Sequence, residues 1–267
     1  MFEEFYHFQT SPFSRDIPTR NLFDSPEMTE VISRMQYVCE KQLFAVLSGD
    51  CGTGKTTALR KLNDLLDPRH YRMMYVSDSR LTPREFYRIL LEQLGIIAPW
   101  NSAEAKSMLH EKLSVMKAVD GIKAVCVVDE AHLLSFTMLE EIRFLLNMKF
   151  DSISPIALIL AGQPELWERR LSLKKCEAIY QRIDVQSVLN HYDRERTGAY
   201  IRHLLSYAGT DAEIFTEKAI DKIFEFSKGT ARTINKVCTS SLLYGSQNRL
   251  RLIDDHAIAL VIEGEFA

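Results

Sequence analysis

The segment that most constrains this chain runs from Gly49 to Thr56 and reads Gly-Asp-Cys-Gly-Thr-Gly-Lys-Thr. It fills every fixed position of the pattern Gly-x-x-x-x-Gly-Lys-[Ser/Thr], in which the glycines let backbone N–H groups turn toward a chain of phosphates. The apolar run 43–47 predicts a buried strand before it, and the periodic run 57–66 predicts a helix after it. Strand, glycine loop and helix are the context that the motif requires, so a chance glycine turn is the weaker interpretation.

The predicted cofactors are ATP and Mg²⁺, because this loop suits a triphosphate and its ion. Lys55 is expected to reach the β- and γ-phosphates, and the Thr56 hydroxyl to ligate Mg²⁺. The helix N-terminus adds partial positive charge where the phosphates lie. The residues expected to line the nucleotide from this loop are Gly49, Asp50, Cys51, Gly52, Thr53, Gly54, Lys55, Thr56 and Thr57.

A second acidic segment completes a hydrolytic site. Residues 122–128 are apolar on both faces, which is typical of a central parallel strand, and they end in Asp129-Glu130. Asp129 is placed to hold Mg²⁺ either through a water molecule or within the coordination shell that includes Thr56. Glu130 is placed to orient and deprotonate the attacking water. A dedicated carboxylate base favours ATP hydrolysis over a GTPase switch, and the chain has no Asn/Thr-Lys-x-Asp guanine signature.

Composition indicates the class of protein that carries this site and the compartment in which it works. The 267 residues are 46% hydrophobic and 26% charged, with a net charge of −3, as in an ordinary globular protein. Charges of both signs occur throughout, so any DNA contact must come from a local patch. Five cysteines without C-x-x-C spacing favour free thiols in a reducing cytosol. With no signal peptide or transmembrane run in the sequence, we expect a cytoplasmic protein without membrane contact.

The periodicity predicts an α/β core followed by helices. Residues 1–27 form an aromatic- and proline-rich arm, 28–190 a nucleotide-binding α/β core, and 191–267 a small all-α lid. In addition to the two strands already described, strands are expected at 71–76, 156–161 and 184–188. Helices are expected at 27–40, from a capping box at Thr82 to 94, from Asn101 to 118, from Thr137 to 148, and at 193–208, 216–229, 231–244 and 254–263.

Phosphoryl transfer also requires positive charge or hydrogen-bond donors at the γ-phosphate. Gln163 follows the 156–161 strand and could position the water or the phosphate; the alternative is an ordinary turn residue. Arg182 precedes the last strand and is the predicted arginine finger toward a neighbouring subunit, with Arg169 and Arg170 as substitutes. Arg232 opens a lid helix and could sense the γ-phosphate. For each arginine the alternative is a surface side chain.

Together these residues resemble the AAA+ ATPases, and more closely the branch of the ExeA-type secretion ATPase and the transposition helpers TniB, TnsC and MuB. The supporting segments span most of the chain. They are Tyr6-x-Phe8, Ser11-Pro12-Phe13, 49–56, 127–132, Ala161-Gly162-Gln163-Pro164-Glu165-Leu166, Gln181-Arg182-Ile183 and 229–235. The Gly-Gln-Pro-Glu-Leu and Gly-x-x-Arg-x-Ile-Asn segments are the more specific ones.

The resemblance implies a three-layer sandwich with a parallel five-stranded sheet of order 5-1-4-3-2, a helical lid, and active sites at subunit interfaces of a ring or helical filament. Secretion members of the branch carry further segments after the ATPase, whereas this sequence ends after the lid. We therefore expect an ATP-dependent regulator of DNA transposition that coats double-stranded DNA, recruits a DDE-type transposase and disassembles on slow, assembly-dependent hydrolysis. The alternatives are a soluble ATPase subunit of a secretion or envelope-assembly system, and an ATP-gated assembly protein with negligible hydrolysis.

Contacts with DNA are the least specified by sequence. Loops after the second and third strands could present Arg80, Arg84 and Lys149 to phosphates, although each could equally be a solvated surface charge. No helix-turn-helix, zinc finger or aromatic-basic stacking platform is evident, so sequence-independent and salt-sensitive binding is expected. The string Asp129-Glu130-Ala131-His132 also spells a helicase box, but a helicase of that class needs two RecA-like domains and this chain has room for one.

Overall fold

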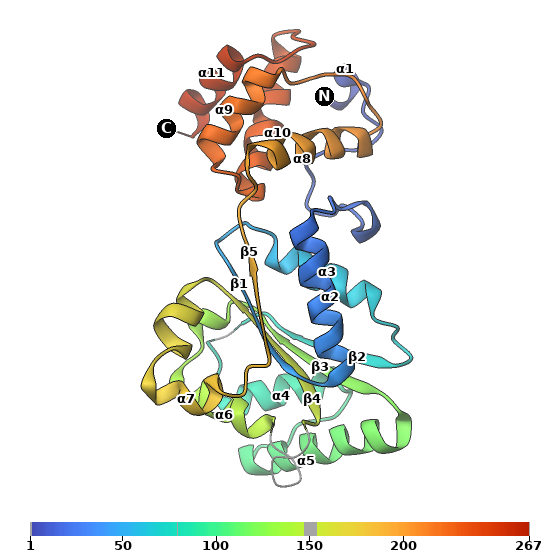
Figure 1. Ribbon diagram of the computed structural model, residues 1–267. Helices are drawn as coiled ribbons and strands as arrows, with labels where there is room; N and C mark the ends of the chain where they lie inside the picture. Colours follow the sequence, from blue (N-terminus) through green and yellow to red (C-terminus); the bar gives the residue numbers. More distant parts are fainter. Residues whose placement is uncertain (1, 79, 147–153, 267) are drawn as a thin grey trace. The chain divides into compact units, whose positions relative to one another are not determined.

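A computed structural model describes residues 2–78, 80–146 and 154–266 of the chain. Its centre is a five-stranded sheet in the order β2-β3-β4-β1-β5, in which every pairing is parallel (Figure 1). This confirms the α/β class expected from the sequence and the strand order that the resemblance implies. The strands are β1 (Phe44–Gly49), β2 (Tyr71–Val76), β3 (Lys123–Val128), β4 (Ile156–Gly162) and β5 (Val185–Leu189).

The central strands are buried on both faces, which explains their continuous apolar sequences. All residues of β1 and β4 are buried, as are all but the first residue of β3, whereas the edge strands β2 and β5 alternate. Such burial is expected of a parallel sheet covered by helices on both sides. Because the strands are parallel, the carboxyl ends of β1, β3 and β4 lie together at one end of the sheet, where ligands bind in open α/β folds.

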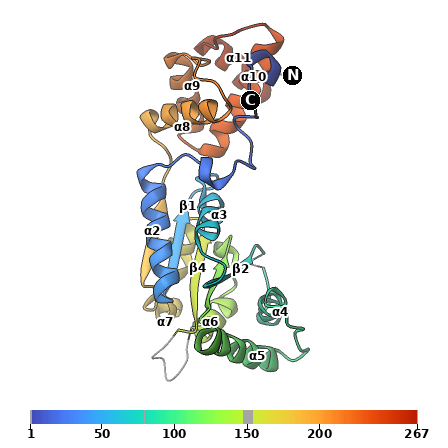
Figure 2. The same ribbon diagram turned by 90° about the vertical axis from the view of Figure 1, so that its right-hand side faces the viewer.

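Helices cover the two faces of the sheet and make a three-layer sandwich (Figures 1 and 2). α2 (Pro26–Lys41) and α3 (Lys55–Leu65) bury their apolar faces in one core. α4 (Pro83–Gln93), α5 (Ser102–Val115) and α6 (Phe136–Leu145) pack in the core on the other face. Shorter elements are η1 (Thr19–Asn21), η2 (Met116–Asp120), η3 (Ala131–Leu133), η4 (Leu166–Leu171), η5 (Lys174–Cys176) and α7 (Glu177–Tyr180).

Side-chain caps account for most of the helix starts. Thr82 forms the predicted capping box with Glu85, and Asn101 accepts a hydrogen bond from the main-chain N–H of Ala103. The expected start of α6 at Thr137 is wrong: Ser135 is the N-cap, and its side chain accepts from the N–H of Met138. A serine two residues upstream captures the same kind of free N–H, because Ser and Thr are both good N-caps.

The described chain divides into two compact units. One comprises Glu27–Asp50 and Lys55–Leu189, and contains the sheet; the other comprises Met1–Pro26, Cys51–Gly54 and Asn190–Ala267. In the second unit the N-terminal arm shares one apolar core with the C-terminal helices, and the Tyr6 hydroxyl donates to the carbonyl of Leu250. Its helices are α1 (Phe2–Tyr6), α8 (Arg194–Tyr207), α9 (Glu217–Ser227), α10 (Ala231–Gln247) and α11 (Asp255–Glu265).

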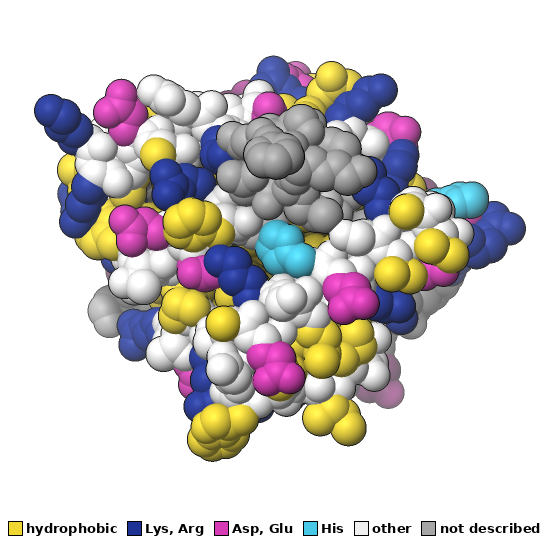
Figure 3. Space-filling model, turned by 90° about the horizontal axis from the view of Figure 1, so that it is seen from below, with side chains coloured by type: hydrophobic (Ala, Val, Ile, Leu, Met, Phe, Trp, Pro, Cys, Tyr) yellow, Lys and Arg dark blue, Asp and Glu magenta, His cyan; other side chains and the backbone are white. Residues whose placement is uncertain are grey.

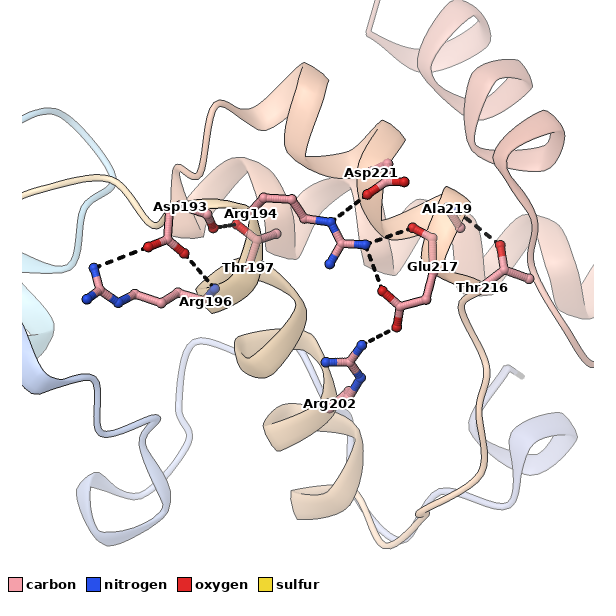
Figure 4. Close-up of polar contacts among 9 residues, drawn as sticks. All are labelled: Asp193, Arg194, Arg196, Thr197, Arg202, Thr216, Glu217, Ala219 and Asp221. Carbon is pink, nitrogen blue, oxygen red and sulfur yellow. Dashed lines mark hydrogen bonds and ion pairs between the residues drawn. The ribbon is translucent and has the colours of Figure 1, made fainter.

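Ion pairs join α8 to α9 within this helical unit (Figure 4). Arg194 donates to Asp221 and to both the side chain and the main-chain carbonyl of Glu217. Arg202 reaches the second carboxylate oxygen of Glu217. Because one carboxylate is held by two arginines from the neighbouring helix, the packing angle of α8 on α9 is fixed by directional contacts as well as by apolar burial.

Candidate nucleotide site

The glycine loop has the backbone that its sequence predicts. Gly52 and Gly54 have φ values of 86° and 102°, a region that side-chain-bearing residues avoid. Lys55 begins α3; it is buried, and its ammonium group donates to the carbonyls of Gly49 and Asp50 at 2.6 and 2.9 Å. The lysine therefore curls back along the loop, with its charge at the helix N-terminus where an anion is favoured.

Thr56 and Asp129 lie together at the carboxyl edge of the sheet. The Thr56 hydroxyl donates to Asp129 Oδ2 at 2.9 Å, and Asp129 is 4% exposed at the end of β3. A hydroxyl and a carboxylate side by side are oxygen ligands of the kind that Mg²⁺ takes, usually with waters and substrate phosphates completing its shell. The pair therefore fits the ion that the sequence implies, and the assignment of these two residues as its ligands stays a prediction.

Tyr75, near the end of β2, also binds Asp129, and sequence reasoning missed it. Its hydroxyl donates to Asp129 Oδ2 at 2.6 Å. Burial, and then the hydrogen bond to the Asp129 carboxylate, raise the pKa of Tyr75, so the phenol remains protonated and acts as a donor. The other carboxylate oxygen, Oδ1, accepts from the main-chain N–H of Glu130 at 2.8 Å.

Glu130 has a left-handed backbone, with φ of 50° and ψ of 33°. This conformation is uncommon for a residue other than glycine, and backbone strain of this kind concentrates at functional sites. The turn directs the chain from β3 into η3, and the Glu130 side chain is 46% exposed. A half-exposed carboxylate beside Asp129 is suitably placed to contact a water molecule, as the predicted role of Glu130 requires.

His132 connects Glu130 with Gln163. His132 Nδ1 lies 3.5 Å from Glu130 Oε2 and 3.4 Å from the main-chain nitrogen of Gln163. Its Nε2 lies 3.2 Å from the Gln163 side-chain nitrogen. The structure thus brings the predicted base and the predicted polar residue after β4 to the same imidazole. The close approach depends on Gly162, where a Cβ would come within 3.0 Å of the His132 main-chain nitrogen.

Arg232 approaches the glycine loop within the helical unit, to which Cys51–Gly54 belongs. Its main-chain N–H donates to the Gly52 carbonyl at 3.3 Å, and its guanidinium donates to Cys51 Sγ at 3.2 Å. A Cβ on Gly52 would lie 2.9 Å from atoms of Thr230 and Arg232, so only glycine allows this approach. These contacts place a cation beside the loop; that Arg232 senses a phosphate stays a prediction.

Arg182 lies near the amino ends of β1 and β5, at the opposite end of the sheet from the glycine loop. It falls between α7 and β5, and the nearby Asp184 pairs with Phe44 at the start of β1. The glycine loop follows the end of β1, six residues or roughly 20 Å away. Arg182 is therefore remote from the glycine loop of its own chain, as a residue acting on a neighbour would be. Of the substitutes, Arg169 is exposed, while Arg170 donates to the carbonyl of Leu134.

The structure describes two of the three candidate DNA contacts, Arg80 and Arg84. Lys149 lies outside the described residues. Arg80 is exposed before α4, and the Arg84 guanidinium lies 3.7 Å from the centre of the Trp100 ring, with Trp100 itself 84% exposed. The sequence did not indicate this single cation–aromatic contact, because Arg84 and Trp100 are sixteen positions apart and only the turn between α4 and α5 brings them together.

All five cysteines are free, as expected, and only Cys51 is exposed. Among the described residues, no helix combines the length and apolarity needed to cross a bilayer.

Comparison with known proteins agrees with this geometry. Residues 38–169 match a family model described as an AAA domain. The chain therefore contains an AAA domain and is an ATPase. It is 28% identical over 247 residues to General secretion pathway protein A of Aeromonas hydrophila, covering 91% of this chain and 44% of that protein. The chain thus spans less than half the length of this curated relative.

Solved structures show the same fold. The Aeropyrum pernix ORC2 protein, described in ADPNP–ADP complexes, superposes with a TM-score of 0.72 at 12% identity, covering 97% of this chain and 72% of that one. The Aeropyrum pernix ORC1 protein in complex with DNA gives 0.70 at 15% identity, covering 92% and 67%. At such identities the likeness concerns the fold alone. The cofactors of this ATPase are ATP and Mg²⁺.

Proposed function

We propose that this ATPase is a nucleotide-driven switch serving a secretion or envelope-assembly system. The observation that carries the proposal is the similarity to General secretion pathway protein A, which extends over 91% of this chain. The sequence motifs favoured a transposition regulator, with a secretion role as the alternative, and the curated relative supports the secretion role better. The chain spans only 44% of that protein, so the secretion role of the whole relative applies to this chain as a proposal.

In the proposed cycle, Lys55 and the loop N–H groups hold the triphosphate, and Thr56 and Asp129 hold Mg²⁺. Glu130 deprotonates the attacking water, Gln163 orients it through the His132 contact, and Arg182 of a neighbouring subunit stabilises charge on the γ-phosphate. Because Arg182 is remote from its own loop, hydrolysis would depend on assembly into an oligomer. Bound ATP would hold the assembled state, and hydrolysis would release it.

The test replaces the gene copy in the host cell with Glu130→Gln and measures how much of a secreted enzyme reaches the medium. We expect secretion to fall while a cytoplasmic enzyme made in the same cells is unchanged. Leu133→Gln, on an exposed side chain three residues away, is the matched control and should leave secretion intact. Normal secretion in the Glu130→Gln cells, with the variant shown to be present and inactive, would overturn the proposal.

A DNA-binding regulator of transposition, recruiting a DDE-type transposase, is the second candidate. The specific observation is the Arg84 guanidinium, which the exposed Trp100 ring holds at 3.7 Å from its centre, because an arginine fixed in this way can contact the phosphates of a DNA duplex. One observation argues against extensive contact with phosphates. On the face shown in Figure 3, basic, acidic and hydrophobic side chains are mixed, and no large area carries charge of one sign. On this face, any such binding would therefore rest on a small local patch.

One binding assay separates the candidates. A random-sequence duplex is titrated with ATP, with ADP and without nucleotide across a salt series, and each sample is imaged. ATP-dependent coating of the duplex that weakens with salt, and that Arg84→Ala reduces, would favour the transposition role and lead to a transposase pull-down. Nucleotide-dependent oligomers that ignore DNA would favour the secretion role.

A further inference from the structure

The carboxylate of Asp129 accepts hydrogen bonds from Thr56, from the main-chain N–H of Glu130 and from a donor that the predicted nucleotide site does not include. Thr56 and the main-chain N–H of Glu130 belong to the segments already assigned to that site. The third donor is the Tyr75 hydroxyl, which shares oxygen Oδ2 with Thr56 and makes the shortest of the three contacts, at 2.6 Å. With these contacts, both oxygens of Asp129 point in fixed directions.

The register of the sheet places Tyr75 there. Tyr75 pairs with Val127, and Asp129 is two residues beyond Val127, so the two side chains emerge on the same face of adjacent chains. That face carries α3, the helix that begins with Lys55 and Thr56. A tyrosine at this point of β2 is long enough to reach across to the carboxylate, which a short side chain would not contact.

A second set of hydrogen bonds holds the main chain of Tyr75 itself. β2 is an edge strand, so the main-chain groups of Tyr75 that face away from β3 have no strand partner. The side-chain amide of Gln93, the last residue of α4, fills this place. Its Oε1 accepts from the Tyr75 N–H and its Nε2 donates to the Tyr75 carbonyl, both at 2.9 Å. Gln93 thereby pairs with Tyr75 as a neighbouring strand would.

We propose that Tyr75 is a positioning residue of the nucleotide site, which orients Asp129 for the Mg²⁺-dependent step and is itself held by Gln93. The inference rests on the proposed assignment of Thr56 and Asp129 to Mg²⁺. Groups that fix a metal-site carboxylate from outside the coordination shell commonly change metal affinity or activity by about 10- to 100-fold when they are removed. Tyr75 acts through Asp129, so its effect appears in the dependence on Mg²⁺.

The test uses Tyr75→Phe, which removes only the hydroxyl. Tyr71→Phe is the matched control, because the Tyr71 hydroxyl lies on the same strand and also binds a carboxylate, that of Glu40. Binding of a fluorescent ADP analogue is measured in EDTA and across a Mg²⁺ titration, together with the Mg²⁺ dependence of kcat. For Tyr75→Phe we expect unchanged binding in EDTA and a Mg²⁺ half-saturation raised about 10-fold. Tyr71→Phe should match the original protein.

Asp129→Asn separates failure of this inference from failure of the site assignment. If Asp129→Asn changes the Mg²⁺ dependence and Tyr75→Phe does not, the role of Tyr75 is wrong while the metal assignment stands. If neither variant changes it, the assignment of Asp129 fails and the inference fails with it. Equal loss of binding in EDTA and in Mg²⁺ for Tyr75→Phe would show a merely structural tyrosine and would also overturn the inference. Gln93→Leu should repeat the Tyr75→Phe effect in weaker form.

Discussion

Glu130 and Lys55 lie on different segments of the predicted site, so their loss should separate binding from chemistry. Glu130→Gln keeps the size of the side chain but removes the base, and should lower kcat by about 100-fold or more while ATP still binds and assembles the protein. Lys55→Ala removes a buried cation from the phosphate loop and should abolish nucleotide binding and assembly. Nucleotide titrations and light scattering measure both. A Glu130→Gln variant with normal turnover would mean that another group is the base.

Glu141 provides a residue-scale test away from the site. Burial alone would raise the pKa of Glu141, but hydrogen bonds from Lys106 at 2.6 Å and from Tyr87 at 2.5 Å outweigh it, and the net pKa is lowered. A lowered carboxyl pKa contributes stability above the unfolded value, near 4.5, and this contribution is lost as the pH falls through the folded value.

We therefore expect Glu141→Gln to lower the unfolding midpoint at pH 7, with a deficit that is constant down to about pH 5 and closes below pH 4.5. Denaturant melts over this range measure it. Glu140→Gln, on the exposed side of the same helix, is the control and should show no such pH dependence. A deficit that persists unchanged at acid pH would show that the loss comes from packing rather than from the ion pair.

At the scale of elements, the start of α6 tests how a cap is chosen. Ser135→Ala removes the acceptor for the Met138 N–H and should cost about 1 kcal/mol of stability, because an uncapped donor remains at the helix end. Thr137→Ala changes a residue already inside the helix, and should cost little, since alanine is the better helix former. Chemical denaturation of both variants checks the order, and the reverse order would restore Thr137 as the cap.

Elements with strong periodicity were predictable, and short strained ones were not. The strands β1, β3 and β4 are visible in sequence because burial on both faces makes them continuously apolar. The π-helical turn η4 and the short α7 had no such signal, since neither is long enough to show a period. Their conformation depends on packing of Leu166, Leu171 and Ile179 into the core, which is a tertiary effect.

The candidate site divides in the same way. Residues in the glycine loop and after β3 were predicted from local motifs, because their chemistry is encoded in adjacent positions. Tyr75 and His132 were not, because each acts through a contact with a distant segment. Tyr75 was nevertheless within reach of sequence reasoning: once β2 is placed beside β3, the register puts it next to the turn that carries Asp129. Gln93 was not, since its role depends on where α4 ends.

At the scale of the whole molecule, the proposed role of Arg182 as an arginine finger toward a neighbouring subunit predicts that one chain alone is an incomplete catalyst. Arg182→Ala should bind ATP but hydrolyse slowly, and Glu130→Gln should do the same for a different reason. If Arg182 acts on the neighbouring subunit, mixing the two variants should restore part of the activity, because Glu130→Gln subunits supply the arginine and Arg182→Ala subunits supply the base. Steady-state hydrolysis against mixing ratio should pass through a maximum.

Arg169→Ala is the control for this mixture, since Arg169 is exposed nearby and is the substitute finger. If Arg169→Ala alone is inactive and is rescued by Glu130→Gln, the finger is Arg169 and the assignment of Arg182 is wrong. A mixture of Arg182→Ala and Glu130→Gln whose activity is only the sum of its parts would instead place Arg182 outside the catalytic machinery. Partial rescue restricted to the Arg182 mixture would establish that the active site is shared, so that turnover reports on assembly itself.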